Sequence, residues 1–314
     1  MTQSTIDPTP DGERVAGGIV AHHDAAAGWF GRLVHQIRPD QWDLPTPCSE
    51  WNVRDLVNHV TGEALWTSPL MAGGTIAEVG DRFDGDVLGA NPVDAWDAAA
   101  ARARTAVAAP DAVNRTVHLS FGDTPAAEYV SQLFADHLVH GWDLAEAIGA
   151  DTRMDPDLVS ACATWFDTVE HVYRDAGGIG PRAPVDPGAD AQTVLLARFG
   201  RSATLAVVER FNAAFARRDV DEIMSLMTDD CVFESTGPAP DGGRFEGRAA
   251  VRRCWEDLFA STPSARFESE EALASADRAV LRWTYHWDGG HVRGVDVLRV
   301  RDGRIAEKLS YVKG

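Results

Sequence analysis

The chain has 314 residues with a formal net charge of −19, and 45% of its residues are hydrophobic. This length exceeds that of a usual single domain, so we expect two domains with well-formed cores. The acidic balance argues against nucleic acid and against anionic membrane surfaces as partners, because both repel an acidic protein.

The first thirteen residues are polar and contain no apolar stretch of the kind found in signal peptides. No apolar run approaches the roughly 20 residues needed to span a bilayer. The four cysteines form no CxxC pair and no disulfide-dense pattern; they are Cys48, Cys162, Cys231 and Cys254. We therefore expect a cytoplasmic protein with reduced thiols.

Residues 1–12 are rich in Pro, Thr and Asp, and we predict that they are disordered. Long stretches with helical apolar periodicity follow, and Pro and Gly residues mark several of their ends. The predicted helices span residues 13–37, 49–66, 93–108, 125–149 and 156–177. This pattern predicts an all-α helical bundle, which we assign to residues 13–201.

The pattern changes after Gly200. Residues 203–314 begin with helices, at 204–217, 220–227 and 249–261. Strand-like segments lie at 231–235, 265–274, 278–287, 291–301 and 304–312. Helices followed by a run of antiparallel strands predict an α+β domain.

Asp136 and His140 are spaced i and i+4 in a predicted amphipathic helix, so they lie on one face, one above the other. Burying both costs several kcal/mol unless something pairs with them. A divalent metal completed by His59, from an earlier helix, would do so and would leave coordination positions open for water or substrate. A His–Asp hydrogen bond without a metal is the alternative.

Two sequence runs resemble the metal-binding N-terminal domain of the mycothiol-dependent maleylpyruvate isomerases, a branch of the DinB-like four-helix-bundle metalloproteins. They are the Pro-Thr-Pro-Cys-Ser-Glu-Trp run at 45–51 and the His-Gly-Trp-Asp-Leu run at 140–144. The resemblance covers roughly residues 15–201. It implies one zinc-like metal held by His59, Asp136 and His140, with Asp136 where the isomerases usually have Glu. It also implies mycothiol as the thiol cosubstrate.

The neighbours of these positions have less specific interpretations. His137 is expected behind the site or at the surface, and Asp143 on a solvated face or in a helix contact, with a supporting role behind a metal ligand as its alternative. Cys48 is expected to pack a tight turn. One of His22 and His23 could approach the site from the first helix.

The C-terminal half resembles a SnoaL-like domain of the nuclear-transport-factor-like superfamily. The resemblance rests on the runs at 208–211, 229–234, 245–248 and 294–305. It implies a cone in which a curved antiparallel sheet wraps around helices and encloses a pocket. Strand alternation places Asp296 among inward-facing positions with His286 on a neighbouring strand, which makes these two a candidate acid/base pair. The alternative is an outward-facing His286 and an Asp296 paired with an arginine such as Arg293 or Arg282.

Three functions follow as hypotheses. The first is a metal-dependent enzyme that activates a low-molecular-weight thiol or water for addition to a small electrophile, of isomerase or S-transferase type. The second is an acid/base isomerase, cyclase or hydrolase that acts in the C-terminal pocket beside a structural bundle. The third is a non-enzymatic small-molecule binding protein. The resemblance also implies a homodimer formed through the SnoaL-like domain.

Overall fold

The computed structural model describes residues 10–48 and 50–313, with side chains from residue 18 onward. It divides into two compact units, Met1–Ala176 and Gly177–Gly314. The division falls inside the range 13–201 that the sequence assigns to the bundle. Residues 1–9 of the segment predicted to be disordered lie outside the described residues, as does Ser49 at the predicted start of the second helix, whereas residues 10–12 already belong to the first helix.

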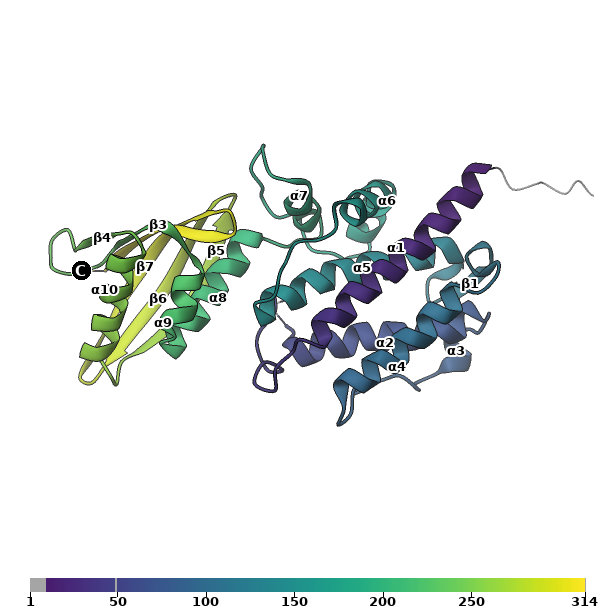
Figure 1. The fold of residues 1–314 in the computed structure, drawn as a ribbon, viewed down its shortest axis with the longest axis horizontal. Helices are drawn as coiled ribbons and strands as arrows, with labels where there is room; N and C mark the ends of the chain where they lie inside the picture. The colour runs from purple at the N-terminus through teal and green to yellow at the C-terminus, as the bar shows by residue number, and fades with distance from the viewer. Residues whose placement is uncertain (1–9, 49, 314) are drawn as a thin grey trace, which may run out of the picture. The chain divides into compact units, whose positions relative to one another are not determined.

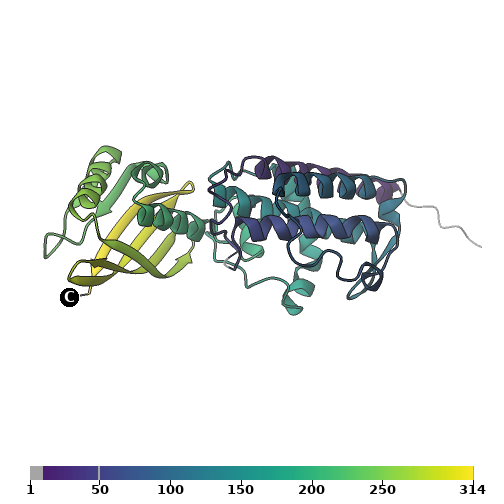
Figure 2. The ribbon, with the colours of Figure 1, turned by 90° about the horizontal axis from the view of Figure 1, so that it is seen from below.

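The first unit is built on long helices, four of which pack on one another as a bundle (Figures 1 and 2). Helix α1 packs against α5 and α4, and α2 packs against α4 and α5. Their bounds are Pro10–Val34 for α1, Val53–Met71 for α2, Pro92–Val107 for α4 and Ala126–Ile148 for α5. A further long helix, α6 (Pro156–Asp175), packs against α5 and α1. The smaller elements are α3 (Ile76–Val79), η1 (Ala112–Asn114) and the hairpin of β1 (Thr116–Leu119) and β2 (Gly122–Pro125).

Local sequence signals set the ends of the two helices that carry the predicted metal ligands. Asn52 caps α2 and forms a capping box with Asp55, so the helix begins at Val53, later than predicted. Helix α5 is bounded as predicted by Pro125 and by Gly149, which takes the left-handed conformation at φ 72°. Most side chains of α5 are buried, on all faces of the helix, and they include polar ones. This helix therefore carries charged groups into the interior of the unit.

The second unit contains a six-stranded sheet in the order β4-β3-β8-β7-β6-β5. Its strands are β3 (Met227–Glu234), β4 (Arg244–Glu246), β5 (Arg266–Ser275), β6 (Arg278–Trp287), β7 (Gly290–Arg301) and β8 (Arg304–Val312). Its helices are α7 (Ala191–Arg198), which the sequence did not predict, α8 (Ala203–Arg217), α9 (Val220–Ser225) and α10 (Arg248–Ser261).

The α+β prediction is confirmed, but the sheet is mixed rather than purely antiparallel, because β3 pairs in parallel with β8. Parallel pairing needs a long crossover. Here β4, α10 and the strands up to β8 supply it. Helices α8 and α10 lie against one face of the sheet and bury a core with it (Figure 1). No helix among the described residues has the length and apolarity to cross a bilayer.

Candidate metal centre

The structure brings the three predicted metal ligands together where α2 contacts α5. His59 comes from the first half of α2, and Asp136 and His140 come from adjacent turns of α5. The ligand atoms of the three side chains all lie within 4.8 Å of one another. Neither helix alone could form this group, so the packing of α2 on α5 creates it.

The spacing of the donor atoms matches what a small divalent ion requires. His140 Nε2 lies 3.3 Å from Asp136 Oδ1, and His59 Nε2 lies 3.5 Å from the same oxygen. Two ligands of a tetrahedral ion with bonds of about 2.05 Å are separated by roughly 3.3 Å. Asp136 Oδ1 therefore lies at about the spacing of a ligand from each imidazole.

A second group of residues that could hold a metal shares His140 but uses its other nitrogen, together with Asp143 and Cys48. His140 Nδ1 lies 2.9 Å from Asp143 Oδ2, which is a hydrogen-bond distance and is shorter than the spacing of two tetrahedral ligands. The Cys48 Sγ lies 3.4 Å from the same oxygen. Asp143 therefore orients the imidazole from behind and directs Nε2 toward His59 and Asp136, as a carboxylate behind a metal-binding histidine commonly does.

This arrangement differs from the interpretation of Asp143 as a solvated residue, because its side chain is fully buried. Cys48 touches the carboxylate as well as shaping its turn. Helical periodicity favoured a solvated position for Asp143. That expectation was wrong because α5 is also buried on faces that would be solvated in a surface helix.

Asp136 and His140 influence each other's charge. Burial alone would raise the pKa of Asp136, but His140 and His59 outweigh burial and hold that pKa well below its usual range. Burial would likewise lower the pKa of His140, whereas Asp136 and Asp143 raise it well above its usual range. Without a metal, a proton on His140 therefore holds the two carboxylates together.

The residues fit a divalent ion on two observations. Asp136 Oδ2 is buried and has no hydrogen-bond partner among the described residues, so this carboxylate has an unused acceptor. Two imidazoles and one carboxylate also form the donor set of catalytic zinc sites with an open position. The side chains of His59 and Asp136 are 31% and 25% exposed, so the open side can be reached from solvent.

Trp51 forms one wall of the site. Its ring centroid lies 4.7 Å from that of His59 and 5.6 Å from that of His140. Trp51 is half-buried, which leaves part of its ring accessible. The aromatic wall therefore restricts the motion of both imidazoles and offers an apolar surface beside the candidate ligands.

Sequence reasoning missed one acidic residue of the site, Glu63. It follows His59 by one turn of α2, so the two share a helix face. Burial and the nearby Asp136 raise the pKa of Glu63, while His59 and His140 act in the opposite direction. The i, i+4 spacing of His59 and Glu63 is the signal that could have revealed it.

The remaining histidines of this region lie elsewhere. His137 is 2% exposed and packs edge-on against His23, with ring centroids 5.3 Å apart. His22 packs against Phe134. His137 is thus a core residue rather than a surface residue.

In the second unit the structure does not bring Asp296 and His286 together. Asp296 lies opposite Leu281 on β6, whereas His286 lies five residues farther along that strand, roughly 17 Å away at about 3.4 Å per residue. Asp296 is fully buried, and its Oδ2 lies 2.6 Å from Lys308 Nζ. His286 is half-exposed and pairs with Glu268. The predicted acid/base pair is therefore not formed.

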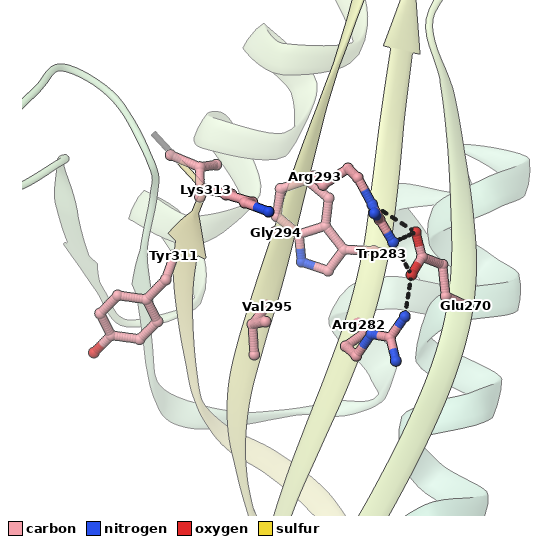
Figure 3. A pocket seen from close by; sticks show the side chains of 9 residues that line it. Glu270, Arg282, Trp283, Arg293, Gly294, Val295, Tyr311 and Lys313 are labelled. Carbon is pink, nitrogen blue, oxygen red and sulfur yellow. Dashed lines mark hydrogen bonds and ion pairs between the residues drawn. The ribbon is translucent and has the colours of Figure 1, made fainter.

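The arginines expected to pair with Asp296 bind another carboxylate. Arg282 and Arg293 both hold Glu270, at 2.7 Å and 2.8 Å (Figure 3). They line an open cavity of about 310 Å³ together with Trp283, Gly294, Val295, Tyr311, Val312 and Lys313. Neither Asp296 nor His286 lines this cavity, so the two candidate residues do not define it.

Comparison with known proteins assigns both halves. Residues 23–145 match the mycothiol maleylpyruvate isomerase N-terminal domain, and residues 208–308 match the SnoaL-like domain. Two Mycobacterium tuberculosis proteins named as uncharacterized are similar to the chain, MT0763 from strain CDC 1551 / Oshkosh and Rv0738 from strain H37Rv. Each is 35% identical over 175 residues, which is 54% of this chain and 84% of the relative.

Among solved structures, an NTF2-like protein of unknown function from Mesorhizobium loti is 44% identical, with a TM-score of 0.34; the match covers 36% of this chain and 92% of that one. An NTF2-like protein of unknown function from Burkholderia pseudomallei is 21% identical with a TM-score of 0.32, over 36% and 92% of the two chains. The chain thus belongs to the family of the mycothiol maleylpyruvate isomerase N-terminal domain, and in it this domain is followed by a SnoaL-like domain.

Proposed function

We propose that this protein is a metal-dependent enzyme that activates a low-molecular-weight thiol or water for addition to a small electrophile. The observation that supports this function most directly is the cluster of His59, Asp136 and His140, whose donor atoms all lie within 4.8 Å of one another. The family's name favours an isomerase with mycothiol as the thiol, and an S-transferase is the related alternative.

In this proposal each side chain has a separate task. His59, Asp136 and His140 hold the ion, for which zinc is the first expectation given two imidazoles and one carboxylate. Asp143 fixes the orientation of His140 through Nδ1. When bound, a divalent ion would supply a coordinated thiol or water that loses its proton near neutral pH.

Two further residues would act on the substrate side. Glu63 is a carboxyl group beside the ligands whose raised pKa suits it to accept and return a proton. Trp51 gives the electrophile an apolar surface to lie on, next to His59. Neither role needs a contribution from the second unit.

Metal content measured by elemental mass spectrometry tests the site on protein purified without a His tag. We expect about one equivalent of a divalent metal. The His59→Ala/His140→Ala variant should lose it. The matched control is His35→Ala, because His35 forms an exposed His–Asp pair with Asp97 in the same unit, outside the site. This control should keep its metal.

Activity is then measured with mycothiol or another small thiol and a panel of activated alkenes, before and after chelation. Turnover that requires the thiol, is lost with chelator and returns with added zinc supports the proposal. Metal-free protein after supplementation, or turnover that is unchanged in the His59→Ala/His140→Ala variant, refutes it.

The homodimer expected through the SnoaL-like domain stays a proposal. Leu273 and Val280 lie opposite each other on β5 and β6 and are 61% and 40% exposed, and Val297 pairs with Val280 in the next strand. This apolar row on the face of the sheet turned away from the helices is the surface that a second copy would cover. Sedimentation velocity should give a dimer that Val280→Glu converts to a monomer.

A further inference from the structure

The open cavity of the second unit has a positively charged lining, although the chain as a whole has a net charge of −19. The charged residues that line it are three cations, Arg282, Arg293 and Lys313, and one carboxylate, Glu270. Arg282 lies two residues beyond Val280 on β6, so it is on the same face of the sheet as the apolar row described above. No residue of that row lines the cavity. The cavity is therefore a separate feature of this face, and its charge favours an anion.

One carboxylate fixes the two arginines. The Arg293 side chain starts on β7 and crosses β6 to reach Glu270 on β5, where its Nε and Nη2 donate at 3.1 Å and 2.8 Å (Figure 3). Arg282 Nη2 and the hydroxyl of Thr284 donate to the same carboxylate, both at 2.7 Å. Hydrogen bonds from Arg293, Thr284 and Arg282 lower the pKa of Glu270 to about 2. Glu270 is therefore charged at neutral pH and holds both guanidinium groups in position.

These ion pairs leave donors unused. A guanidinium group has five N–H donors. Arg282 also binds Glu271 through Nη1, but Arg282 Nε and Arg293 Nη1 donate to no group among the described residues. Lys313 is exposed, and within the described part of the chain its ammonium has no ion pair or hydrogen bond. Figure 3 shows its side chain reaching from the end of β8 toward β7. The cavity thus combines one unpaired ammonium with spare guanidinium donors.

A glycine gives this charged cavity an apolar part. Gly294 lies opposite Trp283 in the strand pairing, and a Cβ on Gly294 would lie 2.2 Å from the indole ring. The close approach of ring and strand therefore requires glycine. Val295 and Tyr311, which are paired on β7 and β8, add to the lining. The volume of about 310 Å³ reaches the lower end of the range for ligand pockets, roughly 300–1,000 Å³.

We propose that this cavity binds a small organic anion, a carboxylate carried on a flat apolar body. The ammonium of Lys313 would pair with the carboxylate, and the spare N–H groups of Arg282 and Arg293 would donate to its oxygens. The apolar body would lie over Val295 and Trp283. An inorganic anion would leave this apolar part of the lining uncovered. The site is separate from the metal centre and does not depend on the function proposed for it.

Isothermal titration calorimetry of the full-length protein with 2-naphthoate and 2-naphthamide tests the proposal, because the two probes share a ring system and differ in charge. We expect one naphthoate to bind per chain, roughly ten-fold more tightly than naphthamide. Added salt should reduce this preference, since it screens exposed charges. Equal affinity for the two probes, or no saturable binding of naphthoate, overturns the proposal.

Three variants locate the charge and the apolar surface. Lys313→Met removes the ammonium and keeps an unbranched apolar side chain, so it should weaken naphthoate binding roughly five-fold and leave naphthamide binding unchanged. Val295→Trp fills the cavity and should abolish binding of both probes. The control Arg304→Met removes an exposed cation that does not line the cavity and should bind both probes as the unmodified protein does. A preference for naphthoate that survives Lys313→Met contradicts the assignment.

The scarcity of lysine allows the same site to be located without any variant. Lys308 and Lys313 are the only lysines of the chain, and Lys308 is 5% exposed. The protein is acetylated with acetic anhydride, and the modified peptides are quantified by mass spectrometry. Saturating naphthoate should slow acetylation of Lys313 but not that of the N-terminal amine, and naphthamide should protect neither. Naphthoate that binds while Lys313 stays fully reactive occupies another site, which overturns the proposal even if the variants fail to fold.

Discussion

His23 is expected to make the first unit sensitive to acid. Its side chain is 1% exposed, and burial and the neighbouring His137 lower its pKa from 6.5 to about 3, with Asp24 acting weakly in the other direction. In the unfolded chain the pKa returns to its ordinary value near 6.5. Between these two values the unfolded chain binds a proton that the folded chain excludes, so stability is complete above pH 6.5 and declines as the pH falls toward 3.

The size of the effect follows from these two pKa values. At about pH 5 the linkage relation gives a loss of about 2 kcal/mol in the free energy of unfolding, relative to neutral pH. His23→Phe removes the titrating group and keeps an aromatic ring against His137. Because His23 Nε2 has no hydrogen-bond partner among the described residues, the phenyl ring leaves no partner unpaired.

The assay is urea unfolding followed by far-ultraviolet circular dichroism at neutral pH and at about pH 5, with chelator present so that metal loss does not contribute. We expect His23→Phe to lose about 2 kcal/mol less than the unmodified protein on acidification. Leu33→Val, a buried substitution in the same helix, should cost about 1 kcal/mol equally at both pH values. An unchanged pH dependence in His23→Phe would refute the reasoning.

Two other predictions concern α5. Asp143→Asn should weaken metal binding about 10- to 100-fold, measured by competition with a chromogenic chelator, because it removes the charge that supports His140; equal affinity would contradict the supporting role. Gly141→Ala should cost about 1–3 kcal/mol of stability, since its Cβ would lie 2.5 Å from the Trp29 ring. The control Gly62→Ala, in α2 with nothing within 4 Å, should be neutral or stabilising, and a similar loss in both variants would refute the packing argument.

The helices of the first unit could be predicted because their signals are local. Pro125 and Gly149 bound α5, and the apolar period places its core face. The parallel pairing of β3 with β8 could not be predicted, because it joins segments far apart in the chain and depends on the crossover between them. The alternation of side chains between the two faces of β3 is the same whether the neighbouring strand runs parallel or antiparallel.

The candidate sites divide in the same way. Asp136 and His140 follow from i, i+4 spacing. The approach of His59 depends on how α2 packs on α5, so no local spacing predicts it, and the family resemblance supported His59 as the third ligand. Lys308 was missed as the partner of Asp296 because the contact depends on the register of β7 with β8. A lysine is usually expected to be exposed to solvent, and only the three-dimensional structure shows that Lys308 is buried beside aromatic rings.

The contact of Cys48 with Asp143 bears on how thiol dependence can be established. An alkylating reagent that reaches this half-buried sulfur would push against the carboxylate that orients His140, and so would disturb the candidate metal site even if no external thiol took part in the proposed reaction. Inhibition by maleimides or iodoacetamide is consequently uninformative about a cosubstrate in this protein. Depletion and re-addition of the small thiol itself, with Cys48→Ser as the background, avoids that confusion.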